Sequence, residues 1–179
     1  MKRKKTVWFS AFTKVVPADY ENWLEDLASQ GWHAERIGQW SSIFLTLRKG
    51  EPRRYRYVYD MQAIPGKDYK ATYEQFGWEF VGQMASALIW RKEYTGERPE
   101  SFSDAESLEK RNRRVMYAAS VSFFLFLLTA AILTVCFALK LGRLTQGDTL
   151  QFILGMALTY AFTIYMGSVL SKIYRNKRR

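Results

Sequence analysis

Two different hydrophobic patterns divide the chain. Over residues 1–109, apolar and polar positions alternate within short stretches, whereas residues 115–139 and 149–171 contain no charged side chain. A helix of about 25 residues is about 37 Å long and exceeds the roughly 30 Å hydrocarbon core of a bilayer. A soluble domain of this size could not cover two helices that are apolar on every face. The pattern therefore predicts a polar N-terminal domain followed by a two-helix transmembrane hairpin.

The polar part predicts two amphipathic helices and several strands. A first helix is expected between Pro17 and Gly31, because its apolar residues recur at helical spacing. They are Tyr20, Trp23, Leu24, Leu27 and Ala28. A shorter helix carries Tyr69, Tyr73 and Phe76 and is expected to end at Gly77. Residues 43–47 and 55–59 alternate with the period of half-buried strands.

These elements occur twice in the same order. Gly31-Trp32 and Gly77-Trp78 each end a helical segment and begin an extended one, and superposing them also places Phe9 on Tyr55. The fold class expected is α+β: a tandem β-α-β-β repeat that forms an antiparallel sheet with two helices on one face. A turn at residues 50–52 is expected to join the two units as a hairpin.

The expected organisation has four parts. They are a duplicated domain (1–94), a polar and basic linker with a stalk helix (95–114), the hairpin (115–171, with spans 115–139 and 149–171) and a basic tail (172–179). Ser103 and Glu106 fit a capping box, so the stalk helix is expected to start near Asp104 and to continue into the first span.

The positive charge of the chain belongs to its C-terminal part. The net charge is +10, but residues 1–109 carry 16 basic and 16 acidic residues, and residues 110–179 carry 11 and 1. Basic residues flank the hairpin and are expected to meet anionic headgroups: Lys110, Arg111, Arg113, Arg114, Lys172, Arg175, Lys177, Arg178 and Arg179. The positive-inside rule then predicts a multi-pass membrane protein with both termini in the cytoplasm.

The spans themselves carry no transport chemistry. Neither contains Asp, Glu, Lys, Arg or His, which ion and proton pathways usually require. Small residues recur at intervals of four, and this spacing favours close helix packing, either within the hairpin or between copies. They are Ala130, Thr134 and Ala138 in the first span, and Gly155 with Thr159 and Gly167 with Ser171 in the second.

The two Gly-Trp units, the aromatic strands and the ending Trp90-Arg91-Lys92 resemble a known family. Over roughly residues 7–94 the chain is similar to bacterial proteins grouped as domain of unknown function family 2812. The resemblance implies a Trp-rich repeat domain followed by membrane helices, and hence a bacterial cell membrane. Members are often encoded beside PadR-like transcription regulators, which implies a link to such a regulator.

No catalytic or metal-binding arrangement stands out. A single Cys excludes an internal disulfide, and one His with one Cys excludes the common zinc sites. His33 stands alone and is expected to be a hydrogen-bonded strand residue rather than a base. Acids crowd the first helix and are expected to form a solvated face: Asp19, Glu21, Glu25 and Asp26. We therefore expect no enzyme activity, cofactor or metal.

The aromatic residues indicate a binding surface. All six Trp lie in residues 1–109, where most are expected to fill the core. Trp40 lies in a turn, and an exposed aromatic beside basic strand ends would suit a ligand or partner. The expected binding residues are Trp40, Arg48, Arg54, Arg56, Tyr57, Trp90 and Arg91. Nucleic-acid binding is not expected, because the domain is neutral.

These features favour a membrane-anchored sensor or regulatory adaptor that is not an enzyme. Its cytosolic domain would bind a small ligand or a protein, and its hairpin would form a homo-oligomer or contact another membrane protein. The alternative is an accessory subunit of a membrane transport or export complex, in which the spans do the work. A membrane-bound lipid hydrolase would need His33 or a carboxylate in a pocket.

Overall fold

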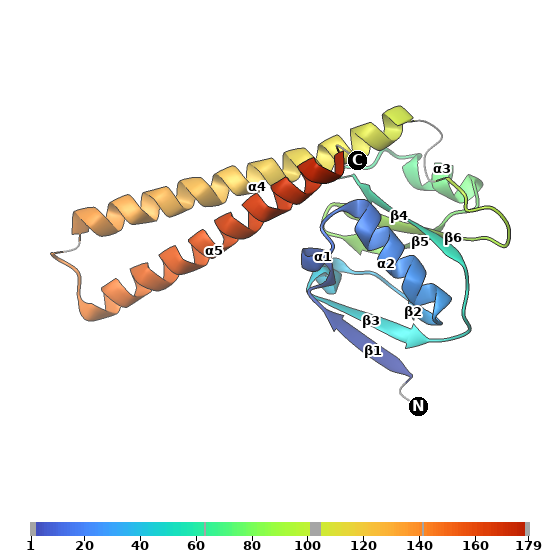
Figure 1. Ribbon diagram of the computed structural model, residues 1–179, viewed down its shortest axis with the longest axis horizontal. Coiled ribbons are helices and arrows are strands. Elements are labelled where there is room, and N and C mark those ends of the chain that lie inside the picture. The colour runs from blue at the N-terminus through green and yellow to red at the C-terminus, as the bar shows by residue number, and fades with distance from the viewer. Residues whose placement is uncertain (1–2, 63, 101–104, 141, 178–179) are drawn as a thin grey trace. The chain divides into compact units, whose positions relative to one another are not determined.

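The computed structural model describes residues 3–62, 64–100, 105–140 and 142–177. The chain divides into two compact units, Met1–Asn112 and Arg113–Arg179. We call the first unit the head and the second the helix pair (Figure 1). The first turns of α4 (Ala105–Lys140) thus belong to the head, and the rest of that helix belongs to the helix pair.

The head consists of two copies of one topology. The first copy contains β1 (Lys4–Trp8), α1 (Ser10–Thr13), α2 (Pro17–Ser29), β2 (Trp32–Ala34), the 3-10 turn η1 (Gln39–Ser42) and β3 (Phe44–Lys49). The second contains β4 (Tyr55–Met61), α3 (Tyr69–Gln75), β5 (Glu79–Met84) and β6 (Ala87–Glu93). Each copy forms an antiparallel sheet of the same order, β1-β3-β2 and β4-β6-β5. The α+β class and the β-α-β-β repeat are therefore confirmed.

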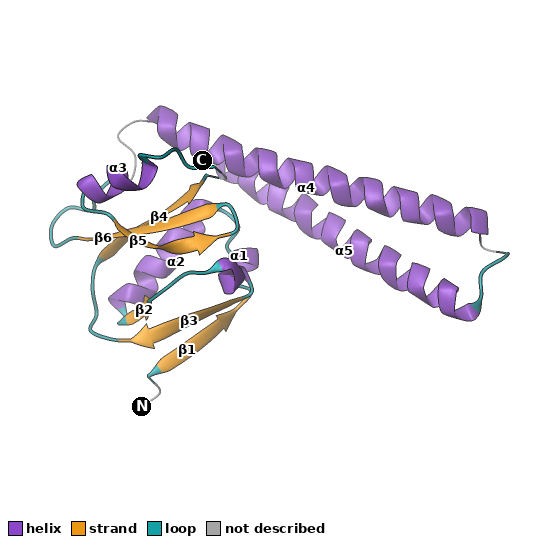
Figure 2. Ribbon diagram, turned by 180° about the vertical axis from the view of Figure 1, so that it is seen from behind, coloured by secondary structure: helices purple, strands orange, loops and turns teal. Residues whose placement is uncertain are grey.

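The arrangement of the layers differs from the expectation in two respects. The described strands form two three-stranded sheets rather than one, and these sheets meet at a parallel bridge between Ile37 and Gly82. The helices lie on opposite faces of the second sheet rather than on one face (Figure 2). Alternation along β4 explains this: Tyr57 packs with α2 in the main core, and Val58 packs with the α3 tyrosines in a smaller one.

Two local predictions of connectivity were wrong. Residues 50–52 do not form a hairpin, because β3 pairs with β1 and β2 whereas β4 pairs with β6. Phe9 does not correspond to Tyr55: Phe9 follows the end of β1, and Tyr55 begins β4. The short helix α1 separates β1 from α2 and has no counterpart among the described residues of the second copy. An alignment without gaps could not reveal this insertion.

The helix pair consists of α4 and α5 (Gln146–Lys177), which lie side by side. Phe126 stacks on Phe162 at 5.1 Å, and Thr134 and Tyr160 share a hydrogen bond of 3.0 Å between their hydroxyls. Both helices are long and apolar enough to cross a membrane, with peak mean hydropathies of 2.5 and 1.6. Many of their large apolar side chains stay exposed, among them Leu128.

The small residues of the spans mediate contact within the pair. Ala130 is fully buried, and a Cβ added at Gly167 would lie 3.4 Å from the ring of Phe123. One added at Gly155 would lie 3.8 Å from Leu133. Helix α4 runs unbroken from Ala105, as expected for a stalk that continues into the first span. The predicted cap residues Ser103 and Asp104 lie outside the described residues.

Candidate functional site

Two carboxylates of α2 bind the open edge of the second sheet. Strand β4 is an edge strand, so alternate backbone N–H groups have no neighbouring strand to bond. Glu25 accepts the N–H of Tyr57 at 3.1 Å, and Glu21 accepts that of Tyr59 at 2.9 Å. Residues four apart on a helix are separated by about 6 Å and residues two apart on a strand by about 6.6 Å, so the two spacings match. The carboxylates thus replace a missing strand.

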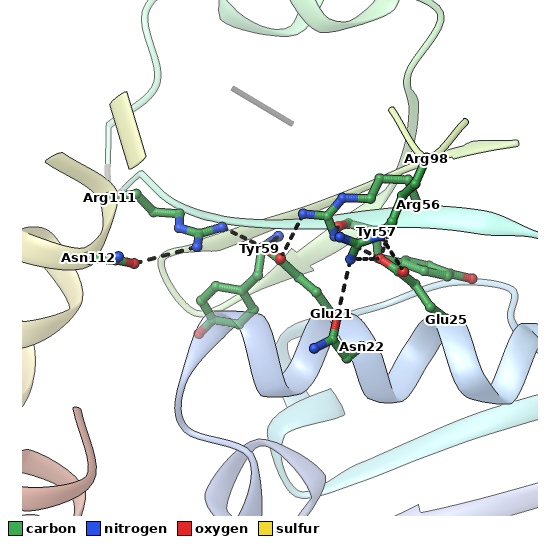
Figure 3. Close-up of polar contacts among 9 residues, drawn as sticks. All are labelled: Glu21, Asn22, Glu25, Arg56, Tyr57, Tyr59, Arg98, Arg111 and Asn112. Atoms are coloured by element: carbon green, nitrogen blue, oxygen red, sulfur yellow. Dashed lines mark hydrogen bonds and ion pairs between the residues drawn. The ribbon is translucent and has the colours of Figure 1, made fainter. Parts of the chain in front are cut away.

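Three arginines from separate segments converge on these carboxylates (Figure 3). Arg56 of β4 donates to Glu25 at 2.7 Å and to Glu21 at 3.2 Å. Arg98 donates twice to Glu25, at 3.0 Å each, and Arg111 of α4 donates to Glu21 at 2.7 Å. We call these five residues the ion cluster: Glu21, Glu25, Arg56, Arg98 and Arg111.

Burial makes the ion cluster a strong structural constraint. The side chains of Glu21, Arg56 and Arg111 are only 3%, 8% and 6% exposed. A buried charge that loses its partner is strongly destabilising, whereas a cluster in which each arginine bonds a carboxylate is tolerated. The cluster therefore fixes the first turns of α4 to α2 and β4, within the head.

A second site is an open hollow of about 420 Å³ at the start of β4, next to the ion cluster. It is lined by residues of both sheets and of the link between them: His33, Glu35, Arg48, Lys49, Gly50, Glu51, Arg53, Tyr55 and Arg91. We call it the hollow. Four basic residues face two acidic ones, so its lining carries a net charge of +2 with His33 neutral.

Arginine side chains of the hollow pair with glutamates but still have N–H groups available to bond a ligand. Arg48 contacts Glu35 through Nε at 2.8 Å, and Arg53 contacts Glu93 through one Nη at 2.8 Å. Each guanidinium has five N–H groups, so both can bond a further anion. Burial lowers the pKa of Arg91, but its hydrogen bonds to Glu79 and its electrostatic interactions with Tyr57, Glu79 and Tyr55 together outweigh this and raise it overall. The hollow thus suits carboxylate or phosphate groups.

Strand β4 connects the hollow to the ion cluster. Tyr55 lines the hollow, with its ring 4.9 Å from the guanidinium carbon of Arg91, and the next residue in β4 is Arg56. Tyr57, two residues on, is almost fully buried, and burial raises its pKa to about 12. One short strand therefore carries residues of the hollow, the cluster and the core.

The hollow contains only some of the binding residues that we predicted. Arg48 and Arg91 line it, whereas Arg54 lies over Tyr94 and Trp40 is exposed on η1. Three of the predicted surface residues are buried: Arg56 joins the ion cluster, Tyr57 packs in the main core and Trp90 in the smaller one. Strand alternation alone could not tell which face of β4 and β6 a helix would cover.

The predicted membrane flank also includes a residue with another role. Arg111 is buried against Glu21 and is not available to headgroups, whereas Lys110, Arg113 and Arg114 are exposed. On α5, Lys172 is half-buried and Arg175 exposed. The side chain of Lys177 is not described, and Arg178 and Arg179 lie outside the described residues.

The prediction missed the ion cluster, and the interpretation of its acids was wrong. Glu21 and Glu25 do not form a solvated face, since Glu21 is buried and both bond β4. Both glutamates lie next to Leu24 and Ala28, on the border of the apolar stripe of the helix, and this position in the sequence could have indicated that they face the sheet. Among the described residues, no group of three His, Cys, Asp or Glu could hold a metal ion. His33 donates through Nε2 to the carbonyl of Glu51 at 2.7 Å.

Comparison with known proteins gives one family. A family model described as a protein of unknown function (DUF2812) matches residues 17–126, well over half of the chain. The match extends past the expected residues 7–94 into α4. No curated protein and no solved structure matches the chain. The expected link to PadR-like regulators stays a prediction.

Proposed function

The chain belongs to the DUF2812 family of proteins of unknown function, and we propose that it is a membrane-anchored regulatory adaptor without enzyme activity. Its head would bind a small anionic ligand in the hollow. The observation that carries this proposal is the ion cluster, which ties α2 and β4 to the first turns of α4. Helix α4 then continues unbroken into the first candidate span.

The ligand class follows from the charges of the hollow. Arg48, Lys49, Arg53 and Arg91 supply permanent positive charge and N–H donors. A di- or tricarboxylate or a phosphate ester complements this arrangement, because planar guanidinium groups bond such oxygens in pairs.

Transmission would run through β4. A ligand that contacts Arg53 and Tyr55 acts on the start of the strand, one residue before Arg56. Arg56 bonds both carboxylates, and Glu21 bonds Arg111. A change in the position of Arg56 therefore changes the environment of α4 in the head. Coupling of this kind requires that the ligand favour one of two arrangements of the cluster.

The membrane arrangement proposed is a double crossing with both termini in the cytoplasm. The exposed basic residues Lys110, Arg113 and Arg114 precede the first uncharged run, residues 115–139, and Lys172 and Arg175 follow the second, residues 149–171. Between the helices the turn carries few charges, which the positive-inside rule places outside. The exposed basic groups would contact anionic headgroups on the cytoplasmic side.

Citrate and inorganic phosphate, titrated into the full chain in nanodiscs, test this proposal. Calorimetry should show saturable binding that Arg53→Gln weakens at least tenfold, while Arg54→Gln leaves it unchanged. Arg54 is the matched control, because it is the next residue and carries the same charge but lies outside the hollow. Ligand should also change amide exchange in residues 105–112, and Glu21→Gln should abolish that change. Absence of saturable binding, or binding without a change in α4, contradicts the proposal.

A further inference from the structure

An aromatic patch on the head shares no residue with the hollow or the ion cluster. Trp8, Phe9, Phe12 and Phe44 are all exposed, Trp8 by 63%, and adjacent rings lie 6.0 to 6.4 Å apart. We call these four residues the aromatic patch. Trp40, 65% exposed, stands on η1, which contacts α1 and β3. Contiguous exposed rings of this size mark an interaction surface.

The backbone is shaped so that these rings stay outside. Trp8 and Phe44 are cross-strand partners in the β1–β3 ladder, and such partners project from the same face of a sheet. Phe9 follows with φ 53° and ψ 31°, a left-handed conformation that is unusual for a bulky residue. Its N–H still bonds the carbonyl of Ile43 at 2.6 Å. The left-handed conformation costs free energy, and the exposed ring of Phe9 recovers little of it by burial. This combination indicates that the ring has a role at the surface.

The segment that carries the patch is strongly basic. Residues 1–14 contain five Lys or Arg and no Asp or Glu, although residues 1–109 together are neutral. Arg3, Lys4 and Lys5 are exposed at the start of β1, at the opposite end of the strand from Trp8. Exposed Trp and Phe rings beside Lys and Arg are the composition of segments that lie in the interface of an anionic bilayer.

We propose that the aromatic patch docks onto an anionic lipid surface, with its rings among the headgroups and the basic residues against the lipid charge. The inference rests on the proposed function in one respect, since the membrane helices keep the head close to a bilayer. A tethered surface of this kind binds at high effective concentration, so a small patch is sufficient. Docking would hold the head at the membrane independently of the ligand in the hollow.

The test uses the full chain with Cys136→Ser and a single labelling site. Thr13→Cys, exposed beside Phe12, receives an environment-sensitive fluorophore, and Ala71→Cys on α3 is the matched labelling control. The protein is reconstituted in vesicles of phosphatidylcholine alone or with one quarter phosphatidylglycerol. The expected result is a blue shift of the Thr13 label that is larger with phosphatidylglycerol, and no shift of the Ala71 label.

Two further variants test the aromatic rings. Phe9→Gly should abolish the shift, because glycine adopts the left-handed φ without strain and only the ring is lost. Ile64→Gly removes an apolar side chain elsewhere in the head that is even more exposed, 88% against 52% for Phe9, and should leave the shift intact. A label that stays in water in both lipids overturns the inference, and so does a shift that depends on protein density and not on lipid charge, which would indicate a second copy. Vesicle flotation separates the two proposals: failure to float refutes the membrane anchor, whereas flotation without a shift refutes only the docking.

Discussion

Neutralising Glu21 should destabilise the head far more than neutralising an exposed glutamate with equally short hydrogen bonds. Glu21 accepts from Arg56, Arg111 and the N–H of Tyr59, and its side chain is 3% exposed. Glu79 bonds Arg91 twice at 2.7 Å but is 60% exposed. The comparison of Glu21→Gln with Glu79→Gln therefore separates the effect of burial from that of bond geometry.

The expected losses in the free energy of unfolding differ by several fold between the two variants. Glu21→Gln removes the buried carboxylate charge that Arg56 and Arg111 share, and breaking a buried pair in this way costs about 3–5 kcal/mol. Glu79→Gln removes an ion pair whose carboxylate is 60% exposed although its arginine is only 15% exposed, and a pair with an exposed partner contributes about 0–1 kcal/mol. A domain of this size is stable by about 5–15 kcal/mol, so the first variant loses a large share of the total.

Urea unfolding of the full chain in mild detergent measures both values. All six Trp lie in residues 1–109, so tryptophan fluorescence follows the head alone. With a slope of about 2 kcal/mol per molar urea, Glu21→Gln should lower the midpoint by roughly 2 M and Glu79→Gln by less than about 0.5 M. Equal shifts, or a Glu21→Gln midpoint at the wild-type value, would refute the account of the ion cluster.

Three further predictions concern the rest of the head. Burial raises the pKa of Tyr57 from 10.0 in the unfolded chain to about 12 in the folded head. The neutral side chain should therefore contribute its full share of the free energy of unfolding below pH 10, and this share should be lost as the pH rises toward 12. In urea titrations across this pH range, Tyr57→Phe should reduce the loss of stability. Gly82→Ala should cost at least about 1–3 kcal/mol, because a Cβ there would lie 1.8 Å from the carbonyl oxygen of Ile37, whereas Gly66→Ala, with open space around it, should change unfolding by less than about 0.5 kcal/mol. Trp90→Ala should cost about 3–5 kcal/mol in the same assay, since Trp90 is fully buried, and a smaller loss would support a surface role for it.

The sequence predicted those features of the fold that depend on local patterns. The repeated Gly-Trp pairs mark where each helix ends and the next strand begins, and both φ values, 77° at Gly31 and 75° at Gly77, require the glycine. Uncharged runs of more than 20 residues predict the two long helices for a similarly simple reason, since length and composition suffice.

The features that it did not predict depend on contacts between distant segments. Whether β3 pairs with β4, and which face of the second sheet a helix covers, is decided by packing and not by alternation along one strand. The ion cluster joins residues up to 90 positions apart, so no short motif contains it. Arg111 also looked like a member of the basic membrane flank, and only its contact with Glu21 distinguishes it from Arg113.

The most direct test of the membrane arrangement is cysteine labelling in intact cells with a membrane-impermeant maleimide. Two single-cysteine variants on the Cys136→Ser background are compared: Gly142→Cys in the turn between α4 and α5, where nothing lies within 4 Å, and Thr13→Cys in the head. With both termini in the cytoplasm, Gly142→Cys should be labelled in intact cells and Thr13→Cys only after permeabilisation. Labelling of Thr13→Cys in intact cells would contradict this arrangement. So would a protein that is labelled at neither site and is removed from the membrane by washing.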